Sequence, residues 1–333
     1  MLHDVAVVIG RFQPFHDGHL FMVQEALKVA KQLVICVGSS HRARTVKNPF
    51  LFEERKQLIL DNVPEMAERL HIVAVEDQMY HESVWIDHIC AAVTEVAGQD
   101  ASIALVAHDK DSSTYYLKHF PQWQRVELPY YQHLDATPIR HAYFAEQPLG
   151  EGLSSVTQRF LKTFTAEAEY PRLQREYRCL KKYWDEWSGT PYPPFFVTTD
   201  SVVVCQDHLL VIQRKYPPGQ DLWALPGGFV EAGEWIQEGL LRELREETHI
   251  VLSDDQLTTA LKRVKVFDHP TRSQAGRIVT HAGYFDLGDQ DFPQVTADDD
   301  AKTVQWYPLA DIEKLKTRIH DDHFYIVKLL LEN

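Results

Sequence analysis

The stretch G-R-F-Q-P-F-H-D-G-H, residues 10–19, decides how the first half of this chain folds. The apolar run 5–9 before it predicts a strand, and the apolar residues at helical spacing after it predict a helix. In a parallel α/β sheet, ligands bind where strands end, and a helix that begins there presents free N–H groups to an anion. His16 and His19 stand where this helix begins, and Gly18 between them lets a phosphate approach the backbone.

Composition narrows the class of protein. A length of 333 residues favours two domains, and a hydrophobic fraction of 44% is enough for ordinary cores. The formal charge of −14 argues against nucleic acid or an anionic membrane as a partner. The four cysteines form no C-x-x-C pair, and neither a leader peptide nor a run of membrane-spanning length is apparent. We therefore expect a reduced, cytoplasmic protein that binds small molecules.

Apolar runs alternate with helical patterns as far as residue 128. The later runs lie at 33–37, 72–75, 103–106 and 123–128. Strands that alternate with helices predict βαβ units and a parallel sheet, so the ends of these strands should meet on one rim.

The H-x-G-H of residues 16–19 is the signature of the nucleotidyltransferase superfamily, and the longer stretch resembles the archaeal-like nicotinamide-mononucleotide (NMN) adenylyltransferases. This resemblance implies a Rossmann-like domain that transfers adenylyl from ATP to NMN, giving NAD and pyrophosphate. It also implies the catalytic residues, which are His16, His19, Arg11 and Arg140. The imidazoles would donate hydrogen bonds to phosphate oxygens, the guanidinium groups would clamp phosphates, and Mg²⁺ would be held largely by the β and γ phosphates.

Further segments on the predicted rim resemble the same family. Residues 38–50 resemble its G-S-x-x-S-x-T-x-x-N-P-F loop, and residues 108–113 resemble its G-H-x-K-D segment. Trp85 alone suits a helix core, but it matches the tryptophan that stacks on nicotinamide in this family. Taken by itself, Asp109 is nearly as compatible with a polar turn that binds no substrate as with a binding role. The substrate-binding candidates of this half are Gly10, Phe12, Gly18, Ser39, Asn48, Trp85, His108, Asp109 and Thr137.

Residues 135–140, D-A-T-P-I-R, resemble the superfamily's I-S-x-T-x-I-R motif. Thr137 is a suitable N-cap and Pro138 a suitable first helical residue, which would place Arg140 in the first turn of a helix. Asp135 replaces the usual serine, and we assign it no binding role.

Residues 151–194 separate the two halves. Apolar and aromatic residues recur there at loosely helical spacing, which predicts one or two helices that pack between domains or against a partner. Prolines at 191, 193 and 194 end them. The predicted organisation is a domain at 1–150, a helical connector at 151–194 and a second domain at 195–333.

The second half carries L-P-G-G-F-V-E-A-G-E at 225–234 and R-E-L-R-E-E at 242–247, after a predicted hairpin around Asp207. These segments resemble the Nudix box, G-x5-E-x7-R-E-U-x-E-E-x-G-U with U aliphatic, which implies an α/β/α sandwich. Glu243, Glu246 and Glu247 share one helical face, where a divalent cation would relieve their repulsion. We therefore predict a Mg²⁺ or Mn²⁺ site. Its candidate residues are Glu243, Glu246, Glu247 and Gly227.

The box departs from the pattern at His249, where the family has glycine. We expect the helix to end there with positive φ, which histidine tolerates better than most residues.

The Nudix resemblance implies hydrolysis of a nucleoside diphosphate linked to another group, here ADP-ribose, giving AMP and ribose 5-phosphate. We expect catalytic roles for Glu246 and for Asp299, the latter as a base from the acidic run 298–300. Aromatic rings and guanidinium groups elsewhere in this half suit an adenine and a diphosphate, although each of these residues could instead lie on a surface strand. The substrate-binding candidates are Arg214, Phe267, Asp268, Arg272 and Arg277.

Together, the motifs resemble the bifunctional NMN adenylyltransferase/Nudix hydrolase family, whose substrates and products include ATP, NMN, NAD and ADP-ribose. One alternative is a different nucleotidyltransferase, such as a cytidylyltransferase. Another is a Nudix half that senses a nucleotide without turning it over. A homo-oligomer is compatible with the sequence.

Overall fold

The computed structural model describes residues 2–108 and 112–332. The chain divides into two compact units, Met1–Gln174 and Arg175–Asn333. The segment predicted as a connector is shared between them, because helix α6 (Glu169–Trp187) begins in the first unit and continues into the second. Within the described residues, no helix is both long and apolar enough to cross a membrane.

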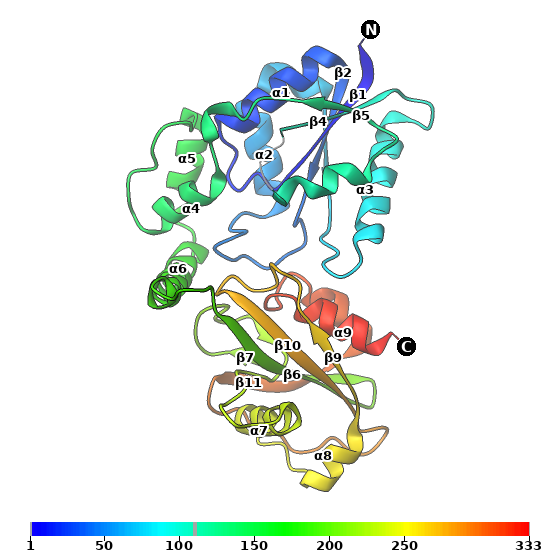
Figure 1. The fold of residues 1–333 in the computed structure, drawn as a ribbon, viewed down its shortest axis with the longest axis vertical. Coiled ribbons are helices and arrows are strands. Elements are labelled where there is room, and N and C mark those ends of the chain that lie inside the picture. Colours follow the sequence, from blue (N-terminus) through cyan, green and yellow to red (C-terminus); the bar gives the residue numbers. More distant parts are fainter. Residues whose placement is uncertain (1, 109–111, 333) are drawn as a thin grey trace. The chain divides into compact units, whose positions relative to one another are not determined.

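The first unit, coloured from blue to green in Figure 1, is built on a five-stranded sheet in the order β3-β2-β1-β4-β5. Its strands are β1 (His3–Gly10), β2 (Ala30–Val37), β3 (Leu70–Ala74), β4 (Ile103–Ala107) and β5 (Gln124–Glu127). Every neighbouring pair is parallel, which confirms the predicted class of sheet. The order reverses between β1 and β4, so the end of β1 lies where ligands bind in open sheets.

Helices cover both faces of this sheet. Alternate residues of β1 point to opposite sides, and both sets are apolar, so each side needs a covering layer. Ala6 and Val8 pack in one core with buried side chains of α1 and α2, whereas Val5 and Val7 pack in another with α3. The helices of this unit are α1 (Asp17–Val29), α2 (Phe52–Asn62), α3 (Glu82–Ala97), α4 (Ala136–Phe144) and α5 (Ser155–Phe164), with 3-10 turns η1 (Pro64–Arg69), η2 (Ser112–His119) and η3 (Tyr131–His133).

The prediction for the start of α4 was wrong by two residues. The N-cap is Asp135, in an extended conformation, and Thr137 and Pro138 both lie inside the first turn. Proline is tolerated there because the first N–H groups of a helix have no intrahelical acceptor in any case. The Thr137 hydroxyl oxygen is therefore available to Arg140 Nη2, which donates to it at 3.0 Å.

The second unit contains a mixed sheet in the order β11-β7-β6-β10-β9, with β8 paired to β7. Its strands are β6 (Phe195–Cys205), β7 (His208–Arg214), β8 (Trp223–Ala224), β9 (Leu261–Phe267), β10 (Arg277–Asp286) and β11 (Ala301–Pro308). The predicted hairpin is confirmed: Gln206 and Asp207, with φ of 46° and 57°, turn β6 into β7.

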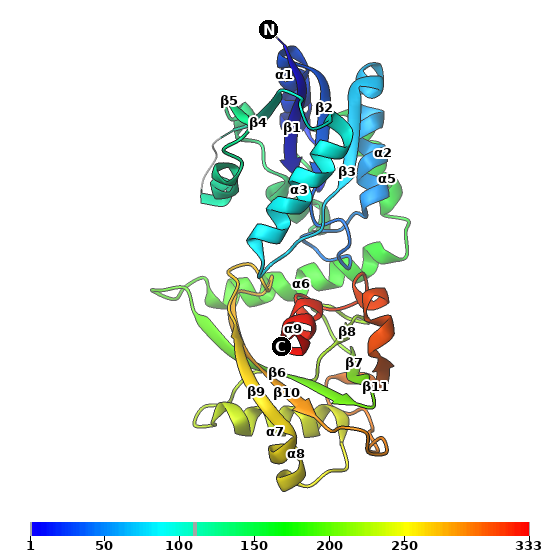
Figure 2. The ribbon, with the colours of Figure 1, turned by 90° about the vertical axis from the view of Figure 1, so that its right-hand side faces the viewer.

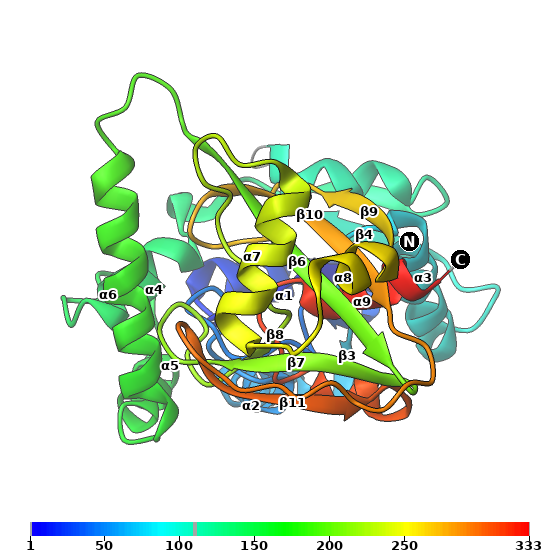
Figure 3. The same cartoon turned by 90° about the horizontal axis from the view of Figure 1, so that it is seen from below.

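Helices α7 (Ile236–Thr248) and α9 (His323–Leu331) lie on opposite faces of this sheet (Figure 2). Figure 3 shows α7 over β6, with α9 on the far side. Leu240 and Leu244 of α7 are fully buried in the core, which leaves the glutamate-bearing side of the helix for the site. The unit also contains α8 (Asp254–Ala260) and the 3-10 turn η4 (Leu309–Leu315). The predicted end of the box helix is confirmed, because His249 has φ of 42° and ψ of 37°.

Candidate active sites

A cavity of about 190 Å³ opens at the end of β1 in the first unit. The loop after β1, the start of α1, the segment 129–135 and the start of α4 supply its walls. The predicted residues that line it are Arg11, Phe12, His16, Gly18, His19, His108, Thr137 and Arg140.

The two motif histidines lie face to face. Their ring centroids are 3.7 Å apart with planes inclined by 27°, and the His16 amide donates to His19 Nδ1 at 3.3 Å. Because His19 Nδ1 accepts, a neutral His19 ring carries its proton on Nε2, ready to donate. A Cβ on Gly18 would lie 3.0 Å from the His16 ring. The glycine therefore makes room for that ring.

Arg140 is 5% exposed and stands at the inner wall of the cavity. Its Nη1 donates to the carbonyl of Gln13 at 2.8 Å. Burial, aided by the charge of Arg11, lowers the pKa of Arg140 to about 9. A buried guanidinium under the influence of a second cation, Arg11, favours an anion beside it, and a phosphate meets that requirement.

Two residues that hold the loops of this site in place were not identified from the sequence. The buried Gln13 side chain exchanges hydrogen bonds with the main chain of Phe50. The Arg55 side chain is 1% exposed and donates to the carbonyls of Arg11, Gly38 and Ser39. Together they fasten the loop after β1 to the loop after β2. Gln13 lies within the motif, but nothing local distinguishes Arg55 from an ordinary charged residue on a helix surface.

Four further candidates do not line this cavity. Ser39 is buried with φ of 52°, and its hydroxyl donates to Asp77 at 2.8 Å. Trp85 packs edge-on against Tyr116 with ring centroids 5.5 Å apart, so its stacking on nicotinamide stays a prediction. The same holds for the roles of Gly10 and Asn48, which lie outside the lining. Asp109 falls outside the described residues.

A larger cavity of about 460 Å³ lies in the second unit, between the Gly-Gly loop and α7. The predicted residues that line it are Arg214, Gly227, Glu243, Glu246, Glu247, Arg272 and Asp299.

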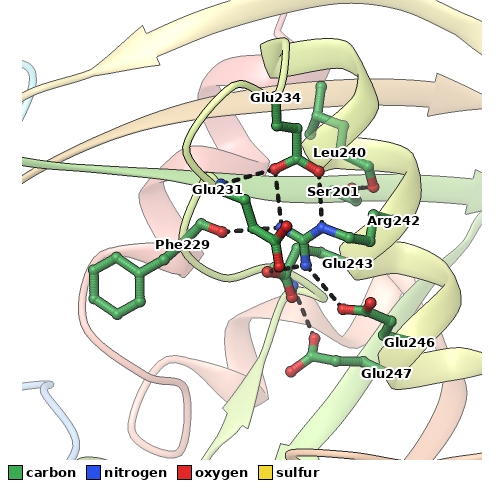
Figure 4. Close-up of polar contacts among 10 residues, drawn as sticks. Ser201, Phe229, Glu231, Glu234, Leu240, Arg242, Glu243, Glu246 and Glu247 are labelled. Carbon is green, nitrogen blue, oxygen red and sulfur yellow. Dashed lines mark hydrogen bonds and ion pairs between the residues drawn. The ribbon is translucent and has the colours of Figure 1, made fainter.

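The α7 carboxylates are arranged around Arg242 (Figure 4). Its guanidinium donates to Glu234 at 2.7 Å and, through Nη1, to Glu243 and Glu246 at 2.8 Å. The carboxylate of Glu247 instead accepts the Gly227 amide at 2.8 Å. Burial raises the pKa of Glu243, and it raises the pKa of Glu247 to about 8. A bound cation would stabilise the charged form of these buried carboxylates.

The chemistry of this donor set fits Mg²⁺ or Mn²⁺, because hard divalent ions prefer carboxylate oxygens. Among the described residues, however, no three acidic, imidazole or thiol side chains lie close enough to hold an ion as they stand. In this arrangement Arg242 bridges Glu243 and Glu246 (Figure 4). The ligand set therefore stays a prediction.

Three predicted substrate contacts lie away from the cavity lining. Phe267 is 1% exposed, so its ring is closed to a ligand in this arrangement. Asp268 is exposed, and its carbonyl accepts from Arg277 Nη1. The Arg277 guanidinium lies over the ring of Phe195, 5.5 Å from its centroid. The end of β9, the loop after it and the start of β10 thus place these three residues outside the cavity lining.

Arg272 does line the cavity, but its guanidinium is bound by the protein. Its Nε and Nη2 donate to the two carboxylate oxygens of Asp322, each at 2.9 Å, and both side chains are buried. Asp322 belongs to the segment H-D-D-H, residues 320–323, which sequence reasoning missed. The Leu225 amide donates to His323 Nδ1 at 2.9 Å, so this segment supports the Gly-Gly loop. No local signal connects it to a motif about ninety residues earlier.

The two units thus define two classes of enzyme. A parallel sheet with paired imidazoles and a buried arginine at the end of β1 is the arrangement of a nucleotidyltransferase, and a glycine loop facing a glutamate-bearing helix is that of a Nudix hydrolase. Comparison with known families agrees: the cytidylyltransferase-like family matches residues 7–76, and the NUDIX domain matches residues 196–330.

Relatives of each half are close enough to identify the family. A nicotinamide/nicotinic acid mononucleotide adenylyltransferase of Acinetobacter baylyi is 40% identical over 178 residues, which are 53% of this chain and 94% of that protein. An ADP-ribose pyrophosphatase of Methanocaldococcus jannaschii is 32% identical over 133 residues, which are 40% of this chain and 70% of that protein.

One solved structure matches both halves at once. It is a bifunctional NMN adenylyltransferase/ADP ribose pyrophosphatase from Francisella tularensis, 38% identical, with a TM-score of 0.95 over 100% of this chain and 99% of that chain. A second structure from the same organism, complexed with AMP and a Mn ion, is 37% identical with a TM-score of 0.92 over 99% of each chain. The chain belongs to the family of bifunctional NMN adenylyltransferase/ADP-ribose pyrophosphatases, which confirms the assignment predicted from the two motifs.

Proposed function

We propose that the first unit joins NMN and ATP in the cavity formed around His16, His19 and Arg140. The observation that carries this proposal is the stacked histidine pair beside a buried guanidinium at the end of the central strand. An NMN phosphate oxygen would attack the α-phosphorus of ATP, forming one P–O bond as the bond to pyrophosphate breaks. Such transfers depend chiefly on positioning and on neutralisation of charge, so a covalent enzyme intermediate is not required.

Each residue has a role in that step. His19 Nε2 and the His16 ring would donate to phosphate oxygens as charge accumulates on them. Arg140 would hold a phosphate from the inner wall, with its orientation fixed by the Gln13 carbonyl and the Thr137 hydroxyl. Arg11 lines the same cavity and supplies the second cationic group.

The second unit, in this proposal, hydrolyses ADP-ribose to AMP and ribose 5-phosphate. The cavity of about 460 Å³ combines anion-binding groups, Arg214 among them, with the acidic face of α7. Glu243, Glu246 and Glu247 would hold Mg²⁺ or Mn²⁺, and Asp299, in the cavity lining, would accept the proton of the attacking water. A bound divalent ion would polarise the diphosphate and acidify that water. The AMP and Mn ion in the Francisella tularensis structure support this assignment.

One product analysis with two variants tests both halves. The protein is incubated with NMN, ATP and Mg²⁺, or with ADP-ribose and Mg²⁺, and the products are identified by chromatography. His19→Ala should abolish NAD formation and leave hydrolysis intact, and Glu247→Gln should do the reverse. Loss of both activities in either folded variant would refute the separation of sites. Tight ADP-ribose binding without turnover would favour the sensor alternative.

A further inference from the structure

His249 occupies a position that a residue with a Cβ adopts reluctantly. It follows α7 with φ of 42° and ψ of 37°, in the left-handed region where the Nudix pattern has glycine. The imidazole makes a contact that glycine could not make: its Nε2 donates to Oδ2 of Asp298 at 2.8 Å.

The Asp298 carboxylate links this contact to the cavity. Its second oxygen, Oδ1, accepts the main-chain amide of Asp299 at 2.8 Å. Asp299 lines the cavity of the second unit and has φ of 48°. A chain of two hydrogen bonds therefore runs from the end of the glutamate-bearing helix to the backbone of the proposed base.

The main chain around Asp299 is held from both sides. On one side the Thr296 and Asp298 amides donate to carbonyls of Thr248 and Glu247, at 2.7 and 3.2 Å. On the other side Lys215 Nζ donates to the Asp299 carbonyl at 3.1 Å. These bonds fix where the loop lies, whereas the His249 contact fixes how the Asp298 carboxylate, and through it the Asp299 amide, is oriented.

The His249–Asp298 pair contributes little to stability, because its side chains are 54% and 66% exposed. Its consequence is geometric. We propose that His249 is a positioning residue of the hydrolase, which orients Asp298 so that Asp299 faces the cavity. This inference rests on the proposed hydrolysis of ADP-ribose.

The experiment compares three substitutions at one position in the full-length protein. His249→Gly restores the family residue and relieves the backbone, and His249→Asn tolerates the conformation but is too short to reach Asp298. Both should lower kcat for ADP-ribose about three- to tenfold with KM little changed. His249→Gln places an amide nitrogen near the position of Nε2 and should retain most of kcat. Adenylyl transfer on the same chain should stay constant.

Thermal unfolding separates positioning from a structural role. Glycine removes the backbone strain of a residue with a Cβ in the left-handed region. We therefore expect His249→Gly to be at least as stable as the wild type, although less active. Asp298→Ala should lower kcat to a similar extent, and the double variant with His249→Gly should lose nothing further. Full kcat in both His249→Gly and His249→Asn, or a loss that follows reduced stability, would overturn the positioning role. A wild-type protein that fails to hydrolyse ADP-ribose would overturn the proposed function itself.

Discussion

The side chain of Gln13 and the main chain of Phe50 exchange two hydrogen bonds of 3.0 Å each, across 37 positions of sequence. Nε2 of Gln13 donates to the Phe50 carbonyl, and the Phe50 amide donates to Oε1. Because both residues are buried, neither main-chain group can turn to water instead. The loop that carries the histidines is thereby tied to the loop after β2.

Gln13→Glu should destabilise the first unit and slow NAD formation. The substitution replaces the Nε2 donor with an oxygen that faces the Phe50 carbonyl, which costs about 1–3 kcal/mol when buried. Thermal unfolding and the two activity assays measure the effect, with hydrolysis expected to be unchanged. Gln147→Glu, at an exposed position of the same unit, is the matched control and should behave as wild type.

Arg55→Met should be more damaging. It keeps the apolar volume but leaves one buried and two partly buried carbonyls without their donor, for an expected loss of about 3 kcal/mol. The rate of NAD formation should fall together with the stability of the first unit. The exposed Arg159 supplies the comparison, since Arg159→Met removes an equal charge from the same unit. Equal stability of the two variants would contradict the role assigned to Arg55.

The two glycines of the Nudix loop should respond differently to alanine. A Cβ at Gly227 would lie 2.1 Å from the Thr199 carbonyl oxygen, so backbone must move and stability should fall. A Cβ at Gly228 would lie 2.6 Å from Oε1 of Glu243, a flexible side chain that can move aside. Gly228→Ala should therefore lose hydrolysis with little change in unfolding temperature. At Gly189 a Cβ meets nothing within 4 Å, so Gly189→Ala is the control for both.

Proton and metal should compete at Glu247. Burial raises its pKa from an ordinary 4.5 to about 8 in the metal-free protein, so between these values the folded chain keeps a proton that the unfolded chain releases. This contribution to stability is therefore complete below pH 4.5 and is lost as the pH rises to about 8.

A divalent ion must displace that proton, so its affinity should increase with pH and level off above about 8. The rise in unfolding temperature on adding Mg²⁺, measured at about pH 6 and about pH 9, reports this change. Glu247→Gln should reduce the difference between the two pH values, and the raised pKa of Glu243 accounts for any difference that remains. A Mg²⁺ effect that is equal at both would show that Glu247 is not a ligand.

Local patterns were sufficient for the class of fold. The apolar run before the first motif, with a helical pattern after it, predicted β1, the loop and α1, because strand and helix periodicities are properties of short segments. The start of α4 was misplaced because Thr137 is both a good N-cap and acceptable in a first turn. The left-handed end of α7 at His249 was predictable, since a motif glycine marks a backbone requirement that a different residue inherits.

Local patterns were insufficient for the membership of the sites. The aromatic Phe267 suited a substrate contact by type, yet it is buried. Nothing local distinguishes Arg55 from an ordinary helix charge, yet its side chain is buried and donates to three carbonyls. His323 lies far along the chain from the Nudix loop that it supports, and Asp322 lies 50 positions from the Arg272 guanidinium that it binds.

The sequence by itself determined two phosphate-handling motifs, the elements that carry them and the pairing of two activities on one chain. The tertiary structure decided which side chains share each cavity, that Arg242 bridges the α7 carboxylates, and that His249 contacts Asp298. The physical reason is range: periodicity and capping depend on neighbours in sequence, whereas burial, pKa and hydrogen-bond partners depend on residues that only folding brings together.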